Sequence, residues 1–123
     1  MRKRISRVSY SHLTIECRDC DRTVLNSASK LRKALREAAS ICKLHVLKED
    51  FHEFRPHGLT AYVLLSESHI SMHTWPEQGF AVVDVLSCSA VEIDSLIKCF
   101  RHSLKARLIE VVTHAQNREP VDH

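Results

Sequence analysis

One stretch of the sequence concentrates side chains that can act as nucleophiles, acids or bases. It runs SESHISMHTWPE over residues 66–77 and, after one residue, GFAVVDVLSC over residues 79–88. Serine and cysteine can attack carbonyl carbons, and histidine and glutamate transfer protons. Exposed loops are usually richer in lysine, glycine and asparagine. The composition of this stretch therefore makes it the candidate site.

Three interpretations stay open on residue types alone. His69 and His73 are four residues apart and could bind a metal from one helix face, but Ile70, the flanking β-type pattern and Pro76 disfavour a helix. A serine hydrolase would need small residues around Ser68 for a strained nucleophile turn, and no glycine flanks it. The third interpretation is a strand, loop and strand whose histidines make only structural hydrogen bonds.

The pattern ESHxSxHTWPE followed by GFAVVDVxSC resembles the small bacterial and archaeal S-adenosylmethionine decarboxylases. The resemblance is weaker over residues 12–21 and 51–58, and it covers most of residues 11–112. It implies that the Ser68 hydroxyl attacks the carbonyl of Glu67 and that the chain cleaves itself between these residues. Ser68 then becomes a self-generated pyruvoyl cofactor, which holds the substrate amine as a Schiff base.

The implied reaction converts S-adenosylmethionine to carbon dioxide and decarboxylated S-adenosylmethionine, the aminopropyl donor for spermidine synthesis. By the same resemblance His73 is the proton acceptor in processing, and Cys88 is the proton donor in decarboxylation. Thr60 stands where family members carry a supporting serine, so processing is expected to survive but to be slower. His69 has no implied catalytic role and is expected to position its surroundings through hydrogen bonds.

Substrate binding is implied for three further residues. Phe54 and Trp75 match the aromatic side chains that sandwich the adenine ring, and Glu77 matches the carboxylate that accepts from the ribose hydroxyls. Residues 54–58 read FRPHG, where the family usually has Phe-Ser-Pro-Gln-Gly, so Arg55 and His57 add a cation and a titratable group. This departure leaves a pyruvoyl-dependent arginine or ornithine decarboxylase open, and a non-catalytic dimeric regulatory relative is the other alternative.

The length and charge of the chain limit the number of domains and the kinds of partner that it can have. Its 123 residues, of which 44% are hydrophobic and 27% charged, suit a single domain over residues 1–123. The longest apolar run covers residues 61–65, which is too short to span a membrane, and the basic residues 2–7 precede no signal-peptide core. We therefore expect a cytoplasmic protein. Without those basic residues the charge is nearly balanced, which favours a solvated tail over residues 1–10 rather than a nucleic-acid surface.

Five cysteines and no secretion signal indicate reduced thiols. Cys17 and Cys20 have the spacing of a zinc-binding pair, but no second such pair follows. Two partly buried thiols are the simpler interpretation, and no metal is expected at the candidate site.

Hydrophobic periodicity predicts the elements that must position these residues. Strands are expected over residues 8–17, 43–51, 59–65, 80–86 and 107–113, with a less regular one over 69–75; helices are expected over 23–42 and after a capping box formed by Ser89 and Glu92. This order predicts an α+β fold, a two-layer αβ sandwich with a largely antiparallel sheet and two helices on one face. The other face is left for solvent or a second subunit. The resemblance implies a homodimer with shared sites, and a heterotetramer of two α and two β chains after cleavage.

Overall fold

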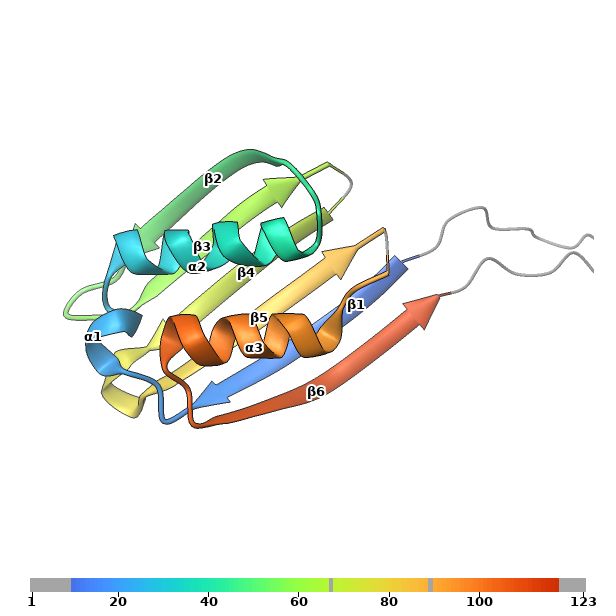
Figure 1. Ribbon diagram of the computed structural model, residues 1–123. Helices are drawn as coiled ribbons and strands as arrows, with labels where there is room; N and C mark the ends of the chain where they lie inside the picture. Colours follow the sequence, from blue (N-terminus) through green and yellow to red (C-terminus); the bar gives the residue numbers. More distant parts are fainter. Residues whose placement is uncertain (1–9, 67, 89, 118–123) are drawn as a thin grey trace, which may run out of the picture.

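A computed structural model describes residues 10–66, 68–88 and 90–117. Six strands form one sheet in the order β2-β3-β4-β5-β1-β6, and every neighbouring pair is antiparallel (Figure 1). The strands are β1 (Tyr10–Arg18), β2 (Val46–Glu53), β3 (Leu59–Leu65), β4 (Ser68–Trp75), β5 (Phe80–Ser87) and β6 (Leu108–Asn117). The α+β sandwich predicted from the sequence is confirmed.

Within the described residues, the three α-helices cover the same face of this sheet (Figure 1). They are α1 (Arg22–Leu25), α2 (Ala28–Ile41) and α3 (Ile93–Leu104), and a short 3₁₀ turn, η1 (Pro76–Gln78), links β4 to β5. The core lies between the two layers, where Leu31 and Leu35 of α2 and Phe100 of α3 are almost fully buried. On the other side, the sheet is open in the single chain.

Strict alternation along the strands sorts side chains between these two faces. In β1, Leu13 and Ile15 are fully buried under the helices, whereas His12 and Thr14 on the open face are only partly covered. The same period of two runs through β3, β4 and β5. The less regular segment 69–75 is therefore an ordinary central strand, which begins at Ser68.

The single helix expected over residues 23–42 is wrong, because this segment forms two helices, each with its own N-cap. Asp21 caps α1 by accepting from the backbone N–H of Val24 at 3.0 Å, and Ser27 caps α2 by accepting from the N–H of Lys30 at 3.3 Å. Both cap residues have extended backbone conformations, so the chain turns between the helices. The face has three helices rather than two, the first being a single turn.

The capping box expected at Ser89 and Glu92 is also wrong. Glu92 is itself the N-cap residue of α3, so it cannot stand in the first turn and reach back to a cap. Ser89 lies outside the described residues. The helix itself is present, and its side chains Leu96, Phe100 and Leu104 are buried.

An ion-pair fork joins α2 to the edge strand β2. The Glu49 carboxylate accepts from Arg32 Nη2 at 2.6 Å and from Arg36 Nε at 2.7 Å. The hydrogen bonds from Arg36 and Arg32 lower the pKa of Glu49 to about 2. This fork ties the otherwise exposed strand β2 to the helix layer.

Two further expectations concern the N-terminal tail and the absence of a membrane-spanning segment. The basic tail predicted for residues 1–10 lies outside the described residues except for Tyr10, which begins β1. Within residues 10–66, 68–88 and 90–117, no helix combines the length and hydrophobicity needed to cross a membrane.

Candidate active site

A cavity of about 400 Å³ opens where β3 begins and β4 ends. Its wall contains Phe54, His57, Gly58, Leu59, Thr60, His73, Thr74, Trp75 and Glu77. Five residues singled out from the sequence thus line one cavity: Phe54, Thr60, His73, Trp75 and Glu77. The sheet register explains the convergence, because β3 and β4 form a hairpin whose far ends meet here.

Thr60 and His73 form a hydrogen-bonded pair on the open face of the sheet. They are directly opposite each other in the ladder between β3 and β4, and Thr60 Oγ1 lies 2.9 Å from His73 Nδ1. A hydroxyl in this position fixes the orientation of the imidazole ring and leaves Nε2 for another partner. Thr60, which stands where the sequence resemblance implies a serine, therefore reaches the histidine.

The cavity floor is fixed by contacts between strands and α1. Thr74 is buried, donates to the backbone carbonyl of Leu25 at 2.9 Å and accepts from the backbone N–H of Leu59 at 2.9 Å. Asn26 holds the adjoining loop by accepting from the N–H of Gly58 at 3.1 Å. Asn26 was not identified from the sequence, because its partner is 32 residues away.

Gly58 is required for the shape of the loop between β2 and β3. Its φ of +104° is one that L side chains rarely adopt, and a Cβ atom there would lie 3.2 Å from the carbonyl oxygen of Thr74. The Gly58 carbonyl accepts from the N–H of Phe54 at 2.8 Å, which closes the loop. Phe54 is thereby held at the cavity although its side chain is half exposed.

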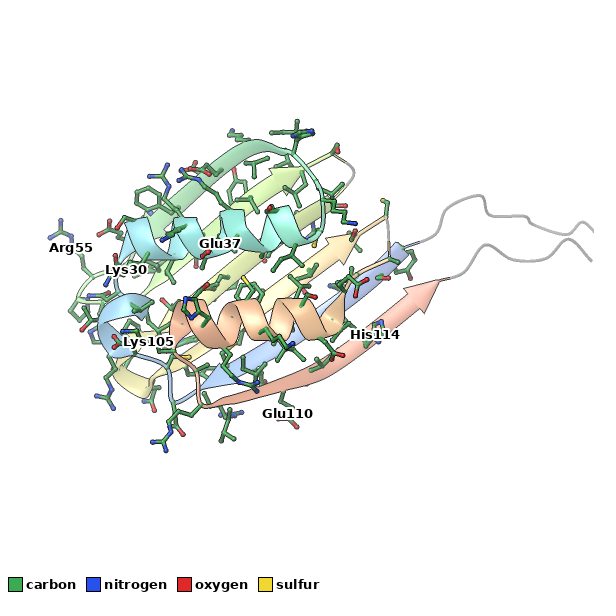
Figure 2. The ribbon with its side chains drawn as sticks, in the orientation of Figure 1. Lys30, Glu37, Arg55, Lys105, Glu110 and His114 are labelled. Carbon is green, nitrogen blue, oxygen red and sulfur yellow. The ribbon has the colours of Figure 1, made fainter. Side chains whose placement is uncertain are left out.

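The aromatic and charged groups of the cavity have defined neighbours. The ring of Trp75 packs against Phe80 with centroids 5.5 Å apart, and the guanidinium carbon of Arg18 lies 4.8 Å from the centre of the Phe80 ring. Glu77 Oε2 is 3.2 Å from His57 Nε2. Arg55 projects outward from the end of the molecule (Figure 2), and it does not line the cavity.

Ser68 and Cys88 lie at the opposite end of β4. Ser68 is 7% exposed, and its Oγ accepts from the backbone N–H of Cys88 at 3.3 Å. Cys88 is exposed and lies just beyond the end of β5. Glu67, the expected residue on the other side of the cleaved bond, lies outside the described residues.

Ser68 and His73 are therefore not neighbours within one chain. Ser68 and His73 are five residue steps apart on an extended strand, which is about 17 Å along β4. The odd spacing also puts them on opposite faces: Ser68 is buried on the helix side, and His73 is exposed on the open side. One chain thus holds two separate parts of the predicted site.

His69 contacts a carboxylate that the sequence did not single out. His69 Nε2 lies 3.4 Å from Asp84 Oδ2, and His12 Nε2 lies 2.8 Å from Asp84 Oδ1. The possibility of a metal held by His69 and His73 is excluded by the strand conformation, which spaces them about 13 Å apart along β4.

Cys17 and Cys20 have the properties of ordinary buried thiols. Burial raises the pKa of Cys17 to about 12 and that of Cys20 to about 11. Cys17 is fully buried and Cys20 is 7% exposed, so both side chains belong to the hydrophobic core. Among the residues described, no three histidine, cysteine or acidic side chains group as metal ligands.

The sequence and the fold of this chain are similar to those of known S-adenosylmethionine decarboxylases. The family model for S-adenosylmethionine decarboxylase matches residues 11–117. The S-adenosylmethionine decarboxylase proenzyme of Thermotoga maritima is 36% identical over 110 residues, which cover 87% of this chain and 83% of the relative. The proenzyme of Thermococcus onnurineus is 43% identical over 77 residues, which cover 63% of this chain and 55% of the relative.

A solved structure shows the same fold. The crystal structure of the adenosylmethionine decarboxylase from Aquifex aeolicus VF5 superimposes with a TM-score of 0.76 at 25% identity, and the match covers 96% of each chain. The sequence motif, the fold and the family match thus lead to one conclusion: this chain belongs to the S-adenosylmethionine decarboxylase family.

Proposed function

We propose that this enzyme cleaves itself between Glu67 and Ser68 and then decarboxylates S-adenosylmethionine with a pyruvoyl group derived from Ser68. The observation that carries the proposal is the cavity in which two aromatic side chains, a carboxylate and a threonine–histidine pair meet. Phe54 and Trp75 offer faces for an adenine ring and a sulfonium cation, and Glu77 offers an acceptor for ribose hydroxyls.

Self-cleavage requires one bond to form and one to break at each step. Ser68 Oγ attacks the carbonyl carbon of Glu67, and the peptide C–N bond breaks to leave an ester and a free amino group on Ser68. Loss of the Ser68 α-proton then expels the Glu67 carboxylate, and water replaces the nitrogen, which leaves as ammonia. We assign the proton transfer to His73, because imidazole accepts protons near neutral pH.

The surroundings of Ser68 suit the pyruvoyl group. Ser68 is the first residue of β4, so cleavage before it leaves the strand intact. The N–H of Cys88 already points to the Ser68 hydroxyl and can donate to an oxygen there after cleavage. When present, the group supplies a ketone for the substrate amine and an electron sink for decarboxylation. We assign to the exposed Cys88 thiol the return of a proton to the substrate carbon.

The separation of Ser68 from His73 requires a second chain to complete the site. We propose a homodimer, and a heterotetramer after cleavage, in which the open sheet faces pack together about a two-fold axis perpendicular to the strands. Such an axis reverses the strand direction and brings the Ser68 end of one protomer to the cavity of its partner. Leu64 on this face is 43% exposed in the single chain and Trp75 is 42% exposed, which supports a covering partner.

The cavity favours a nucleoside substrate over a simple amino acid. Arginine and ornithine have no ring to stack between Phe54 and Trp75, and the Glu77 carboxylate already has an imidazole 3.2 Å away. Arg55, one of the two departures from the family pattern that left this alternative open, does not line the cavity. His57 does line it and is the remaining departure from the family pattern at the proposed adenine site.

The proposal is tested by the denatured intact mass of the purified protein, with Ser68→Ala as the control. We expect two fragments from the wild-type chain, 1–67 and 68–123, the second lighter by one ammonia than a chain that begins with serine. Carbon dioxide should then be released from S-adenosylmethionine and not from arginine or ornithine. A wild-type chain that stays whole would contradict self-cleavage, and release from arginine or ornithine alone would contradict the substrate.

A further inference from the structure

A cluster of polar side chains on the open face of the sheet has no part in the steps above. Its centre is Asp84 in β5, whose carboxylate accepts from His12 Nε2 at 2.8 Å and from His69 Nε2 at 3.4 Å. Thr14 Oγ1 adds a longer contact of 3.5 Å. We call the residues His12, Asp84 and His69 the histidine–aspartate cluster.

The cluster joins three neighbouring strands at one level of the sheet. His12 of β1 and His69 of β4 are both opposite Leu86 of β5 in the ladder, one on each side. The two oxygens of Asp84 therefore hold one imidazole from each flanking strand. Each of the three side chains is between 33% and 44% exposed, so the contacts lie at the surface of the single chain.

His69 links the histidine–aspartate cluster to the proposed cleavage site. His69 directly follows Ser68, the residue that the proposed cleavage turns into a chain end. A strand end that loses its covalent connection tends to fray, because it is no longer held from both sides. The proposed cleavage also exchanges the Ser68 hydroxyl, which accepts from the Cys88 N–H at 3.3 Å, for the oxygen of a new group. The contact between His69 and Asp84 is untouched by this chemistry.

We infer that the histidine–aspartate cluster is a positioning device that holds the new end of β4, and with it the pyruvoyl group, in place after cleavage. The inference rests on the proposed function. Asp84 ties His69 to β5, and His12 fixes Asp84 from β1. In the uncleaved chain the link from β3 to β4 performs the same task, so the cluster matters chiefly once the chain is cut.

The test compares amide hydrogen exchange of residues 70–72 in cleaved and uncleaved protein. The Asp84→Asn variant is prepared in the self-cleaving chain and in the Ser68→Ala chain. In the cleaved protein we expect exchange to rise by roughly fivefold or more, as for the loss of a hydrogen bond to a charged group. In the Ser68→Ala chain we expect a change below about twofold. Glu110→Gln, the same type of change on the exposed strand β6, should alter neither.

Activity supplies a second readout. Because none of the three cluster residues lines the cavity, Asp84→Asn in the cleaved enzyme should lower kcat and leave KM nearly unchanged. His69→Gln retains an N–H donor and should keep the wild-type exchange rate, whereas His69→Ala should not. If Asp84→Asn fails to fold, this pair of His69 variants still tests whether the contact between His69 and Asp84 holds the end of β4 after cleavage.

Two results would overturn the inference alone. One is unchanged exchange in the cleaved Asp84→Asn protein, and the other is an equal rise in cleaved and uncleaved protein, which would mean a merely structural role. A wild-type chain that remains whole by intact mass would overturn the proposed function and the inference with it. The mass measurement therefore distinguishes the two failures.

Discussion

Replacement of Thr74 by valine tests the contacts that fix the cavity floor. Valine has nearly the same shape as threonine but lacks the hydroxyl, which donates to the Leu25 carbonyl and accepts from the Leu59 N–H, both at 2.9 Å. Thr74 is 6% exposed, and Leu25 and Leu59 are buried, so water has little access to the groups left behind. The variant therefore loses two hydrogen bonds in a buried setting.

The expected loss of stability follows from these two groups. An unsatisfied buried polar group costs about 1–3 kcal/mol, so two such groups should lower the free energy of unfolding by about 2–6 kcal/mol. For a chain of this length, this corresponds to a fall in Tm of roughly 10 °C or more. The assay is thermal and urea denaturation at one fixed protein concentration, in the Ser68→Ala background so that every chain is uncut.

The matched control is Thr113→Val on the exposed edge strand β6. Its hydroxyl can be replaced by water contacts, and we expect a change within about 0.5 kcal/mol. If Thr74→Val and Thr113→Val had the same stability, the reasoning that Thr74 ties α1 to the cavity floor would be refuted.

Three further predictions address the edge strand, processing and substrate binding. Because its arginine partners hold the pKa of Glu49 at about 2, below the ordinary 4.5, their contacts stabilise the fold above about pH 4.5 and this contribution is lost as the pH falls toward 2. Glu49→Gln should lack that part of the pH dependence in urea titrations, and an unchanged profile would contradict the fork. Thr60→Val, which removes the hydroxyl next to His73, should slow cleavage roughly tenfold by intact mass while Thr60→Ser does not, and equal rates would argue against the pair. Trp75→Ala should raise KM for S-adenosylmethionine roughly tenfold or more with cleavage intact, the size of one lost stacking contact, and an unchanged KM would remove the tryptophan from the substrate site.

Local patterns in the sequence were sufficient to predict much of the fold. The strand expected over residues 59–65 has those bounds in the structure, because Gly58 ends the preceding loop and polar residues follow Leu65. The helix break at Asn26 and Ser27 was missed because the apolar spacing continues across it. The caps at Asp21 and Ser27 were the available signal, since both are residue types that begin helices.

The candidate site shows where sequence reasoning stops. The stretch 66–88 could be identified from the sequence because its reactive residue types are close together in the chain. The contact between Thr60 and His73 depends on the register of the β3–β4 hairpin, which the structure shows. The contact between His12 and Asp84 joins residues 72 positions apart and depends on β1 lying next to β5. A strand order of this kind is set by packing of the whole sheet, so no local pattern indicated it.

The most direct test of the central claim, a site shared between two chains, is subunit complementation. Ser68→Ala and His73→Ala chains of distinguishable mass are produced separately and together. Neither should be cleaved alone. In the mixed dimer, the His73→Ala chain should be cleaved because its Ser68 meets the His73 of its partner, and the Ser68→Ala chain should stay whole. Absence of cleavage in the mixed dimer, or cleavage of the His73→Ala chain on its own, would contradict the account.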